Sequence, residues 1–555
     1  MASTASQQPQ STLKSTARII ARHVLKHTGV GIVCAVAYFD PGNWGVDLQA
    51  GSQFGYKLLF VVLVAGIFAV FLQVLASRLG CVTGLDLASH CRLLLYNRPK
   101  HTRLYRWLLL YPLYILSEIA IISTDLAELL GSAIALCLLF PQLPLWAGVL
   151  LTASDVLFLL ALGDPLGGRP VRLFELLIAA LVFTVLVCMA VIISKVGVHW
   201  GDAFDGFVPS GTLFKSGGLY TSIGIIGATV MPHSLFLGSA LATQNRLAST
   251  TEDKALFPVN SASSSQSGLT TSTVVTSPHS HWHTIKSNLK DAFRVIPAAE
   301  FAREPATHAE RENRPLAIVR AHLYHGIVDI VISLLGYAVL INSLILILAS
   351  AVFFYGSGAG SGGPASLFDA HDLLKDIVGK PAATLFALAL LASGQSSSII
   401  ATMAGQIVSE GFLRWRVSPI MRRLLTRSLG LVPSMVVAIG VGRSGVDTLL
   451  VASQVALSIV LPFIVFPLLY LTSSRSIMSA KSSTSVELSS QAPVIGDHIS
   501  PQVTSGTADP ELAVAEEVVD YSNGKIVKSI GYFIWLVVVA ANIYAIVSLG
   551  LGEEV

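Results

Sequence analysis

The sequence predicts an all-α membrane protein with about eleven membrane-spanning helices, of which the first and the sixth are broken near their middle. Of the 555 residues, 53% are hydrophobic and only 12% are charged. Soluble domains carry about 25% charged residues, and the mean hydropathy of this chain is +0.68. The composition therefore excludes a soluble globular enzyme and favours an integral membrane protein.

Apolar segments long enough to cross a bilayer recur along most of the chain. We place them at 29–52, 58–79, 107–139, 145–163, 172–194, 217–243, 319–354, 382–411, 424–441, 447–472 and 526–550. The first ten follow one another within residues 29–472, which we interpret as the membrane-spanning core. The last is separated from them by a polar stretch, and we interpret it as an additional helix.

The basic residues of the connecting loops set the predicted orientation. They concentrate in the connections 80–106 and 412–427, which hold Arg92, Arg98, Lys100, Arg103, Arg106, Arg414, Arg416, Arg422, Arg423 and Arg427. The connections 195–216 and 351–381, on the opposite side if the helices alternate, hold few. Because Lys and Arg accumulate on the cytosolic side of membrane proteins, we expect a cytosolic N-terminus and, with an odd number of helices, an external C-terminus.

Three polar regions fall on the predicted cytosolic side. Residues 1–28 form a basic N-terminal tail, and residues 245–315 and 473–525 are rich in Ser and Thr without apolar periodicity. We expect both inserts to be largely disordered. The first contains His279, His281 and His283, which form either a weak metal-sensing tract or part of a solvated disordered segment.

The first apolar segment contains an acid, a proline, a glycine and an amide in a row, Asp40-Pro41-Gly42-Asn43. A carboxylate inside a membrane helix is costly enough to indicate function. Pro41 removes a backbone donor and disfavours helical geometry at Asp40, and Gly42 permits further unwinding. Unwound carbonyls would then lie beside the side-chain oxygens of Asp40 and Asn43, which suits a cation. The alternative is a kinked structural helix that Asp40 caps.

The sixth apolar segment is interrupted in the same way, at Met231-Pro232-His233. Proline-broken helices at matching positions of two five-helix halves indicate an inverted-repeat transporter with a site near the bilayer midplane. Pro232 leaves the carbonyl four residues earlier, that of Ala228, without its usual donor. The alternative for Met231 is plain core packing.

These residues define a candidate metal site. Its ligands would be the Asp40 carboxylate, the Asn43 amide oxygen, the Ala228 carbonyl and the Met231 thioether. Oxygen alone would suit Mg²⁺ or Ca²⁺, whereas the softer sulfur shifts the preference towards Mn²⁺, Fe²⁺ and other transition metals. Gln454 in the tenth segment is a further candidate ligand. Gln395 is a weaker candidate that could instead join helices by hydrogen bonds.

Titratable groups near these breaks suggest a proton route. His233 titrates near neutrality, although it could also be a hydrogen-bonded structural histidine. The third segment carries Glu118, Asp125 and Glu128, and Arg427 in the ninth could be their counter-charge. Carboxylates in series with an arginine indicate a proton relay, but a buried structural ion-pair network fits nearly as well.

The two broken-helix motifs, Asp40-Pro-Gly-Asn43 and Met231-Pro-His233, resemble the paired signatures of the Nramp family of proton-coupled divalent metal transporters. The resemblance extends through Thr124-Asp-Leu-Ala-Glu128 and Ser453-Gln-Val, covers about 29–472, and is closest to fungal manganese transporters. It implies a LeuT-like fold with inverted repeats of spans one to five and six to ten. It also implies metal ligands at Asp40, Asn43, Ala228 and Met231, with Gln454 joining in some states.

The resemblance further implies a proton route through Asp125, with His233, Glu128 and Arg427 as further members. The family commonly has Asn after the Met-Pro-His triplet, whereas this chain has Ser234. Serine keeps a hydroxyl but lacks the amide donor, so proton coupling is less firmly implied than metal binding. The retained Met231 argues against the magnesium- or aluminium-handling relatives of the family.

We therefore expect a secondary transporter that imports Mn²⁺ or Fe²⁺ into the cytosol together with protons, and not an enzyme. The alternatives are a metal-sensing receptor that signals through the cytosolic inserts and a sodium-coupled amino-acid carrier, against which Asp40 and Met231 argue. We expect a monomer in the plasma membrane or an endomembrane, surrounded by lipid, without a cofactor and without a nucleic-acid partner. The transported metal ions and protons are the only ligands expected.

Overall fold

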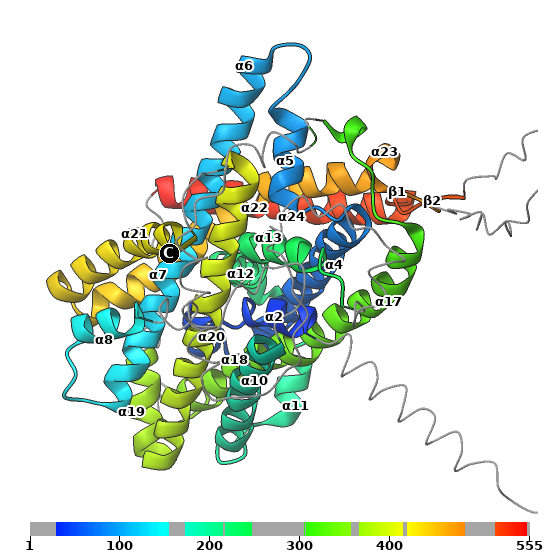
Figure 1. The fold of residues 1–555 in the computed structure, drawn as a ribbon. Helices are drawn as coiled ribbons and strands as arrows, with labels where there is room; N and C mark the ends of the chain where they lie inside the picture. Colours follow the sequence, from blue (N-terminus) through cyan, green and yellow to red (C-terminus); the bar gives the residue numbers. More distant parts are fainter. Residues whose placement is uncertain are drawn as a thin grey trace, which may run out of the picture.

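The computed structural model describes residues 29–154, 172–214, 217–246, 305, 307–356, 366–414, 419–482 and 517–551. The tail 1–28, the residues His279, His281 and His283, and most of both polar inserts lie outside this described part. Within it the chain is almost entirely helical and forms one bundle (Figure 1). The predicted all-α membrane fold is confirmed.

The long helices fall into two halves that each begin with a broken helix. The first half contains α2 (Val30–Val36), α3 (Pro41–Phe54), α4 (Leu59–Thr83), α7 (Tyr111–Leu139), α8 (Leu145–Thr152) and α10 (Arg172–Ile193). The second contains α12 (Gly218–Thr229), α13 (Pro232–Leu241), α17 (Leu316–Ser333), α18 (Leu340–Ala349), α20 (Lys380–Leu413), α21 (Pro419–Gly440) and α22 (Arg443–Ser473). The additional helix is α24 (Lys525–Leu551). The predicted LeuT-like arrangement of two five-helix halves is confirmed.

Shorter elements connect these helices. They are η1 (Gly55–Leu58), α5 (Leu87–Leu95), α6 (Thr102–Tyr105), η2 (Arg106–Leu110), α11 (Trp200–Asp205), η3 (Gly211–Phe214), η4 (His308–Glu310), η5 (Leu334–Val339), η6 (Ser350–Phe354), α19 (Leu367–Ile377) and α23 (Arg475–Met478). Helices α5 and α6 lie at one end of the bundle, and α11 and α19 lie at the opposite end (Figure 1). The first end is the one that the loop charges predict to be cytosolic.

Among the described residues, eight helical stretches are long and apolar enough to cross a membrane. Helices α3 and α4 join through η1 into one of them, Pro41–Thr83, and the apolar helix Leu424–Gly440 is shorter than a full span. The described part of α8 ends close to residue 154, where the description of the chain stops. The count of about eleven spans therefore remains a prediction.

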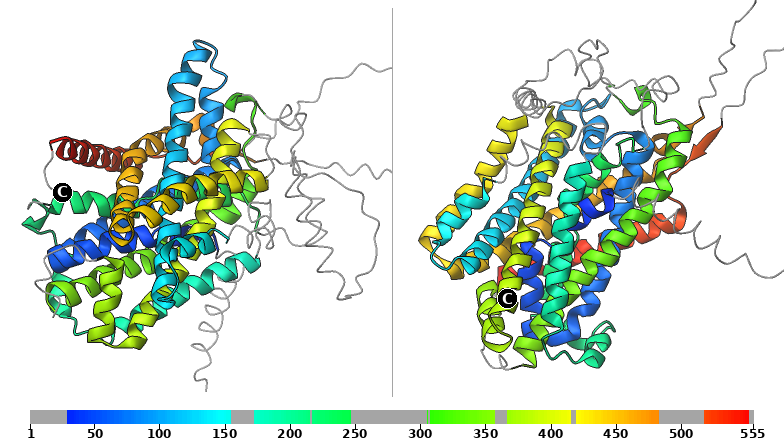
Figure 2. Two further views of the ribbon diagram at one scale, coloured as in Figure 1. Left: turned by 90° about the vertical axis from the view of Figure 1, so that its left-hand side faces the viewer. Right: turned by 60° about the horizontal axis from the view of Figure 1, so that its bottom comes forward.

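A small antiparallel sheet lies within the stretch 473–525, which we expected to be a loop. Strand β1 (Ser479–Lys481) pairs with β2 (Val518–Asp520), with Ala480 opposite Val519. It projects from one side of the bundle (Figure 2). The described residues thus show that both ends of this stretch are folded.

The residues 307–315, at the end of the first insert, dock onto the same end of the bundle as α5 and α6. Arg311 donates to the carbonyl oxygens of Thr83 and Gly84 at the end of α4, at 3.2 and 3.0 Å. His308 Nε2 lies 3.0 Å from Nδ1 of His90 on α5. We call residues 307–315 the docked segment. It holds α4 and α5 against each other.

The first helix break lies in the middle of the bundle because small residues allow close approach around it. A Cβ at Gly131 of α7 would overlap the Pro41 ring, and a Cβ at Gly394 of α20 would overlap Ser132 and lie 3.3 Å from Pro41. Glycine at both positions therefore lets α7 and α20 pack directly against the start of α3.

Candidate metal site

The first break spans residues 37–40, between the end of α2 at Val36 and the start of α3 at Pro41. Asp40 has extended backbone geometry, and its Oδ1 accepts a hydrogen bond of 3.0 Å from the backbone N–H of Asn43. Asp40 is thus the N-cap of α3, and Pro41 occupies the first helical position, where its missing N–H costs nothing. Its other oxygen, Oδ2, is buried and has no hydrogen-bond partner in the described part of the chain.

The carbonyls that the first break exposes are hydrogen-bonded by side chains of other helices. Asn342 on α18 donates to the Tyr38 carbonyl at 2.7 Å. Ser393 on α20 donates to the Phe39 carbonyl at 2.6 Å, and the indole N–H of Trp44 donates to the same oxygen at 3.2 Å. Side chains of other helices therefore satisfy the Tyr38 and Phe39 carbonyls, while the N–H groups of these two residues still donate to carbonyls three residues earlier.

The second break lies between α12, which ends at Thr229, and α13, which begins at Pro232. Met231 is the N-cap residue of α13, with extended backbone geometry and a fully buried side chain. The Ala228 carbonyl accepts a hydrogen bond of 3.0 Å from the side-chain amide of Asn43. The same amide donates to Asp40 Oδ1 at 2.7 Å. Asn43 therefore joins the two breaks directly.

Gln454 on α22 approaches the same point from a third direction. A Cβ at Gly42 would overlap its side-chain amide, so glycine is needed for this contact. Gln454 is fully buried, and its Oε1 has no hydrogen-bond partner among the described residues, whereas its Nε2 donates to Ser453 at 3.1 Å. A buried amide oxygen without a donor is a candidate cation ligand, because burying it unpaired is costly.

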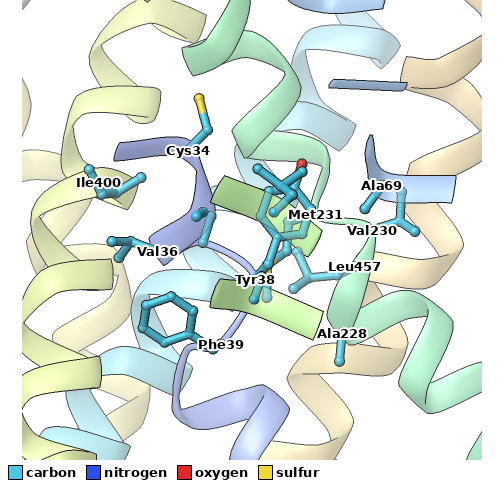
Figure 3. Packing of buried hydrophobic residues seen from close by; sticks show 14 of the residues in the cluster. Cys34, Val36, Tyr38, Phe39, Ala69, Ala228, Val230, Met231, Ile400 and Leu457 are labelled. Carbon is cyan, nitrogen blue, oxygen red and sulfur yellow. The ribbon is translucent and has the colours of Figure 1, made fainter. Parts of the chain in front are cut away.

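Tyr38 and Met231 lie close together between the two breaks, with Ala228 at the end of α12 below them (Figure 3). The Tyr38 hydroxyl is 2.7 Å from Ser234 Oγ and donates to Gln73 of α4 at 3.0 Å. Ser234 in turn donates to the Met231 carbonyl at 2.8 Å. Serine at this position therefore connects the start of α13 to the end of α2 without an amide.

The structure thus brings together all five predicted ligands. Asp40, Asn43, Ala228, Met231 and Gln454 are buried, and hydrogen bonds or close packing connect the breaks and α22. The arrangement provides a carboxylate oxygen, a carbonyl, amide oxygens and a thioether, a mixed set that suits a transition metal ion. Among the described residues, no cluster of three or more His, Cys, Asp or Glu side chains forms an alternative site.

The predicted proton-route residues lie on α7 and on the helices that pack against it. Asp125 forms an ion pair with Arg427 of α21, and both side chains are buried. Arg427 also donates to Ser398 of α20 at 2.5 Å. Thr124 Oγ1 is 3.2 Å from Nδ1 of His233. Asp125 is therefore linked to α20 and α21 through Arg427, while the neighbouring Thr124 reaches the start of α13.

The two remaining acids of the third span differ in environment. Glu128, one turn beyond Thr124, is fully buried, whereas Glu118 is only partly buried, nearer the end of α7 that carries α6. The buried ion pair fits a proton relay and a structural network equally, so both interpretations stay open for Asp125 and Arg427.

Sequence reasoning missed several residues that hold the site. These are Tyr38, Gln73, Asn342 and Ser393, which bind the backbone or the side chains of the two breaks. Asn342 and Gln73 are isolated polar residues inside apolar segments, and that isolation was the available signal. Ser393 offered none, because serine commonly bonds within its own helix.

The fold and the site define a membrane transporter of the Nramp class. A profile described as "Natural resistance-associated macrophage protein-like" matches residues 31–276 and 295–491. The chain belongs to the Nramp family. This confirms the resemblance that the two broken-helix motifs indicated.

Relatives with known names support the same conclusion. The manganese transporter pdt1 of Schizosaccharomyces pombe is 40% identical over 533 residues, covering 96% of this chain and 86% of its own length. The iron transporter SMF3 of Saccharomyces cerevisiae is 35% identical and covers 97% and 98%. A crystal structure of a mutant manganese transporter of Eremococcus coleocola matches with a TM-score of 0.66 and 27% identity, over 100% of this chain and 92% of that one. The family and these relatives are transporters rather than enzymes.

Proposed function

We propose that this protein imports Mn²⁺ and Fe²⁺ into the cytosol and that protons accompany the metal. The metal is the transported substrate, no resident cofactor takes part, and the protein acts as a monomer with a cytosolic N-terminus. The observation that carries the proposal is a pair of buried oxygens, Asp40 Oδ2 and Gln454 Oε1, that have no hydrogen-bond partner among the described residues. The Gln454 amide packs against Gly42, two residues from Asp40, and Asn43 joins Asp40 to the Ala228 carbonyl of the second break, where Met231 is buried.

The chemistry of these groups supports a dehydrating metal site. Among the five candidate ligands, Asp40 supplies the single formal negative charge, and the neutral oxygens replace water ligands. The Asn43 amide currently donates to Asp40 and to the Ala228 carbonyl. Rotation of this amide would present its oxygen to the ion and release both acceptors, so that metal ligation replaces these two hydrogen bonds.

Coupling to protons rests on the buried groups of α7. Asp125 and Glu128 are buried within the span, and His233 contacts the adjacent Thr124. Membrane carboxylates in this setting are typical of proton pathways. We propose that Asp125, with Arg427 as its counter-charge, exchanges the coupled proton, and that His233, Glu128 and Glu118 extend the route.

The experiment is Mn²⁺ uptake into proteoliposomes with and without a pH gradient, with the internal pH recorded at the same time. We expect an inward proton gradient to accelerate Mn²⁺ uptake and each uptake event to acidify the interior. Uptake that neither responds to the gradient nor moves protons would contradict coupling, and no uptake at all would contradict transport.

The alternative of a metal-sensing receptor requires a folded signalling domain. The described residues outside the helical bundle form only the two-stranded sheet and the docked segment. No observation on the described part favours this alternative.

A further inference from the structure

A basic surface lies at the end of the bundle formed by α5, α6 and η2. It carries Arg92, Arg98, Lys100, Arg103 and Arg106, and the sequence from Leu87 to Ser117 contains no Asp or Glu. We call these five residues the α5–α6 basic surface. All are partly or fully exposed. Because α5 and α6 lie at the predicted cytosolic end of the bundle (Figure 1), this charge faces the predicted inner side of the membrane.

Two aromatic rings hold the guanidinium groups in place. The guanidinium carbons of Arg92 and Arg106 lie 3.9 and 3.6 Å from the centre of the Tyr96 ring. Arg98 lies 5.5 Å from the ring of Tyr105. Cation–π contacts of this kind orient the planar groups while leaving in-plane N–H donors available.

The hydrogen-bond acceptors of these arginines within the protein are neutral. Arg92 donates to the Phe412 carbonyl at 2.6 Å, Arg98 to the Leu94 carbonyl at 2.7 Å and Arg106 to the Tyr96 carbonyl at 2.7 Å. Among the described residues none of the three pairs with a carboxylate. Burial and the neighbouring charge of Arg414 lower the pKa of Arg92. The described part of the protein therefore provides no carboxylate that neutralises these three arginines.

The same surface meets the lipid-facing side of the third span. Exposed apolar side chains recur at helical spacing from α7 through η2 into α6, at Ile119, Ile115, Leu108 and Leu104. Trp107, which is 70% exposed, lies beside this stripe, and tryptophan is typical of the boundary between acyl chains and headgroups. This stripe and Trp107 indicate that the arginines lie at the level of the lipid headgroups. A soluble acidic protein or a nucleic acid would have to compete with the membrane lipids for the same arginines.

We propose that the α5–α6 basic surface binds an anionic membrane lipid with a phosphate monoester headgroup, in the leaflet on the predicted cytosolic side. Guanidinium groups bind phosphate oxygens through paired, charge-assisted hydrogen bonds. The acyl chains would lie along the stripe from Leu104 to Ile119. This site is separate from the metal site and does not depend on the proposed transport function.

Helix α5 connects this surface to helices that line the metal site. The backbone N–H of Leu87 donates to Ser239 of α13 at 2.9 Å, and Arg92 bonds the carbonyl of Phe412 in α20. Helix α13 begins at the second break, and Ser393 of α20 donates a hydrogen bond to the Phe39 carbonyl in the first break. A lipid held by Arg92 and Arg106 would therefore stabilise the observed position of α5 against α13 and α20.

The test is native mass spectrometry of the purified full-length protein with an equimolar mixture of dioctanoyl phosphatidylinositol 4-phosphate and dioctanoyl phosphatidylcholine. We expect the wild type to retain the anionic lipid selectively. The variant Arg92→Gln with Arg106→Gln should bind it about 25-fold more weakly, because each basic side chain at a membrane surface contributes roughly a factor of five. The matched control, Arg475→Gln with Lys525→Gln, removes two exposed basic residues elsewhere on the predicted cytosolic side and should bind as the wild type does.

Two further arms keep the proposal falsifiable. Arg98→Gln with Arg103→Gln removes two charges that make fewer internal contacts. This variant should also weaken lipid binding, so it still tests the proposal if the first variant does not fold. Inositol 1,4-bisphosphate without acyl chains should compete poorly, because it lacks contact with the apolar stripe. Equal retention of the anionic lipid by the wild type and by both variants would overturn the proposal, as would full competition by the free inositol phosphate or no preference over phosphatidylcholine.

Discussion

The two carboxylate oxygens of Asp40 have different environments, so the capping role of this residue is observed while its metal-binding role stays a prediction. Oδ1 caps α3 and receives the Asn43 amide, whereas Oδ2 is left without a hydrogen-bond partner in the described residues. A residue that only capped a helix would need no charge, because asparagine caps equally well. The proposed metal ion would account for the charge.

Substitution of Asp40 can separate the two roles. Asp40→Asn keeps a capping oxygen and should leave the free energy of unfolding near that of the wild type, while Asp40→Ala should lose about 1 kcal/mol. Both should abolish Mn²⁺ uptake because both remove the charge. The measurements are thermal unfolding and labelled Mn²⁺ uptake. The control is the variant Asp205→Ala, which removes an exposed carboxylate of α11. Uptake by Asp40→Asn at the wild-type rate would remove the carboxylate from the metal site.

Substitution of Met231 tests selectivity. Met231→Ala should retain appreciable Mn²⁺ transport, weaken competition by the softer Cd²⁺, and strengthen competition by Ca²⁺, which takes 6–8 oxygen ligands. Met231→Ala opens room for a water ligand, whereas Met231→Leu removes the sulfur but fills the space, so only the former should admit Ca²⁺. Competition of labelled Mn²⁺ uptake measures both effects.

The control for this pair is Met189→Ala, which empties a fully buried position on α10, a helix that contains neither break. If Met231→Ala changes neither Ca²⁺ nor Cd²⁺ competition relative to that control, Met231 packs the core and is not a ligand.

At the scale of elements, an ion pair joins α7 to α21. Its members, Asp125 and Arg427, are 302 residues apart in the sequence. Removal of one member leaves a buried charge unpaired, which typically costs about 3–5 kcal/mol. A single substitution would therefore change both the stability of the protein and any proton transfer. Replacing both members of the pair separates the two effects.

Asp125→Asn should lower both the stability and the number of protons that enter per Mn²⁺. The double variant Asp125→Asn with Arg427→Gln removes the unpaired charge, so we expect it to regain stability while proton influx stays low. Thermal unfolding and the internal pH of proteoliposomes during uptake are the measurements. An unchanged proton-to-metal ratio in the double variant would assign the pair a structural role.

The docked segment gives a pH dependence that arises outside the membrane-spanning helices. Burial, followed by the charges of Arg311 and Arg98, lowers the pKa of His308 from 6.5 to about 4. Burial and His308 likewise lower the pKa of His90. Because the undocked histidines bind more protons than the docked ones between pH 6.5 and 4, the stability of docking is complete above pH 6.5 and falls as the pH decreases through this window.

The unfolding temperature should therefore decrease between pH 7.5 and 5 more in the wild type than in His308→Gln, which cannot titrate. The matched control is His371→Gln on α19, a histidine at the opposite end of the bundle. The same pH dependence in the wild type and in His308→Gln would show that docking does not depend on this pair.

At the scale of the whole molecule, much of the fold could be predicted because its strongest signals are local in sequence. A proline disfavours a continuous helix, and at Pro41 and Pro232 polar residues adjoin it, so these two positions located both breaks. Proline alone is not sufficient, because Pro433, Pro462 and Pro467 lie inside the continuous helices α21 and α22. The strands Ser479–Lys481 and Val518–Asp520 could not be predicted, because three residues are too short for periodicity and their partners lie far apart.

The candidate ligands could be proposed from local signals, since four of them lie within four residues of Pro41 or Pro232 and Gln454 interrupts an apolar run. The residues that hold these candidate ligands in position could not be predicted. Asn342 and Ser393 bind carbonyls of residues 304 and 354 positions earlier, and nothing local specifies such partners. Which of the Asn43 amide atoms faces Ala228 is likewise decided only when the two halves of the molecule pack together.

The pairing of β1 with β2 also offers a convenient place to insert a reporter. The chain leaves β1 at Ser482 and returns at Glu517, where the backbone N–H of Ser482 donates to the Glu517 carbonyl at 2.9 Å. The ends of residues 483–516 are thus fixed side by side, independently of what connects them. A fluorescent domain whose own termini are close together can replace that stretch, because lengthening a closed loop costs little free energy. The helix ends at Ser473 and Lys525 would keep their positions, so the fused transporter could be followed by light in a living cell.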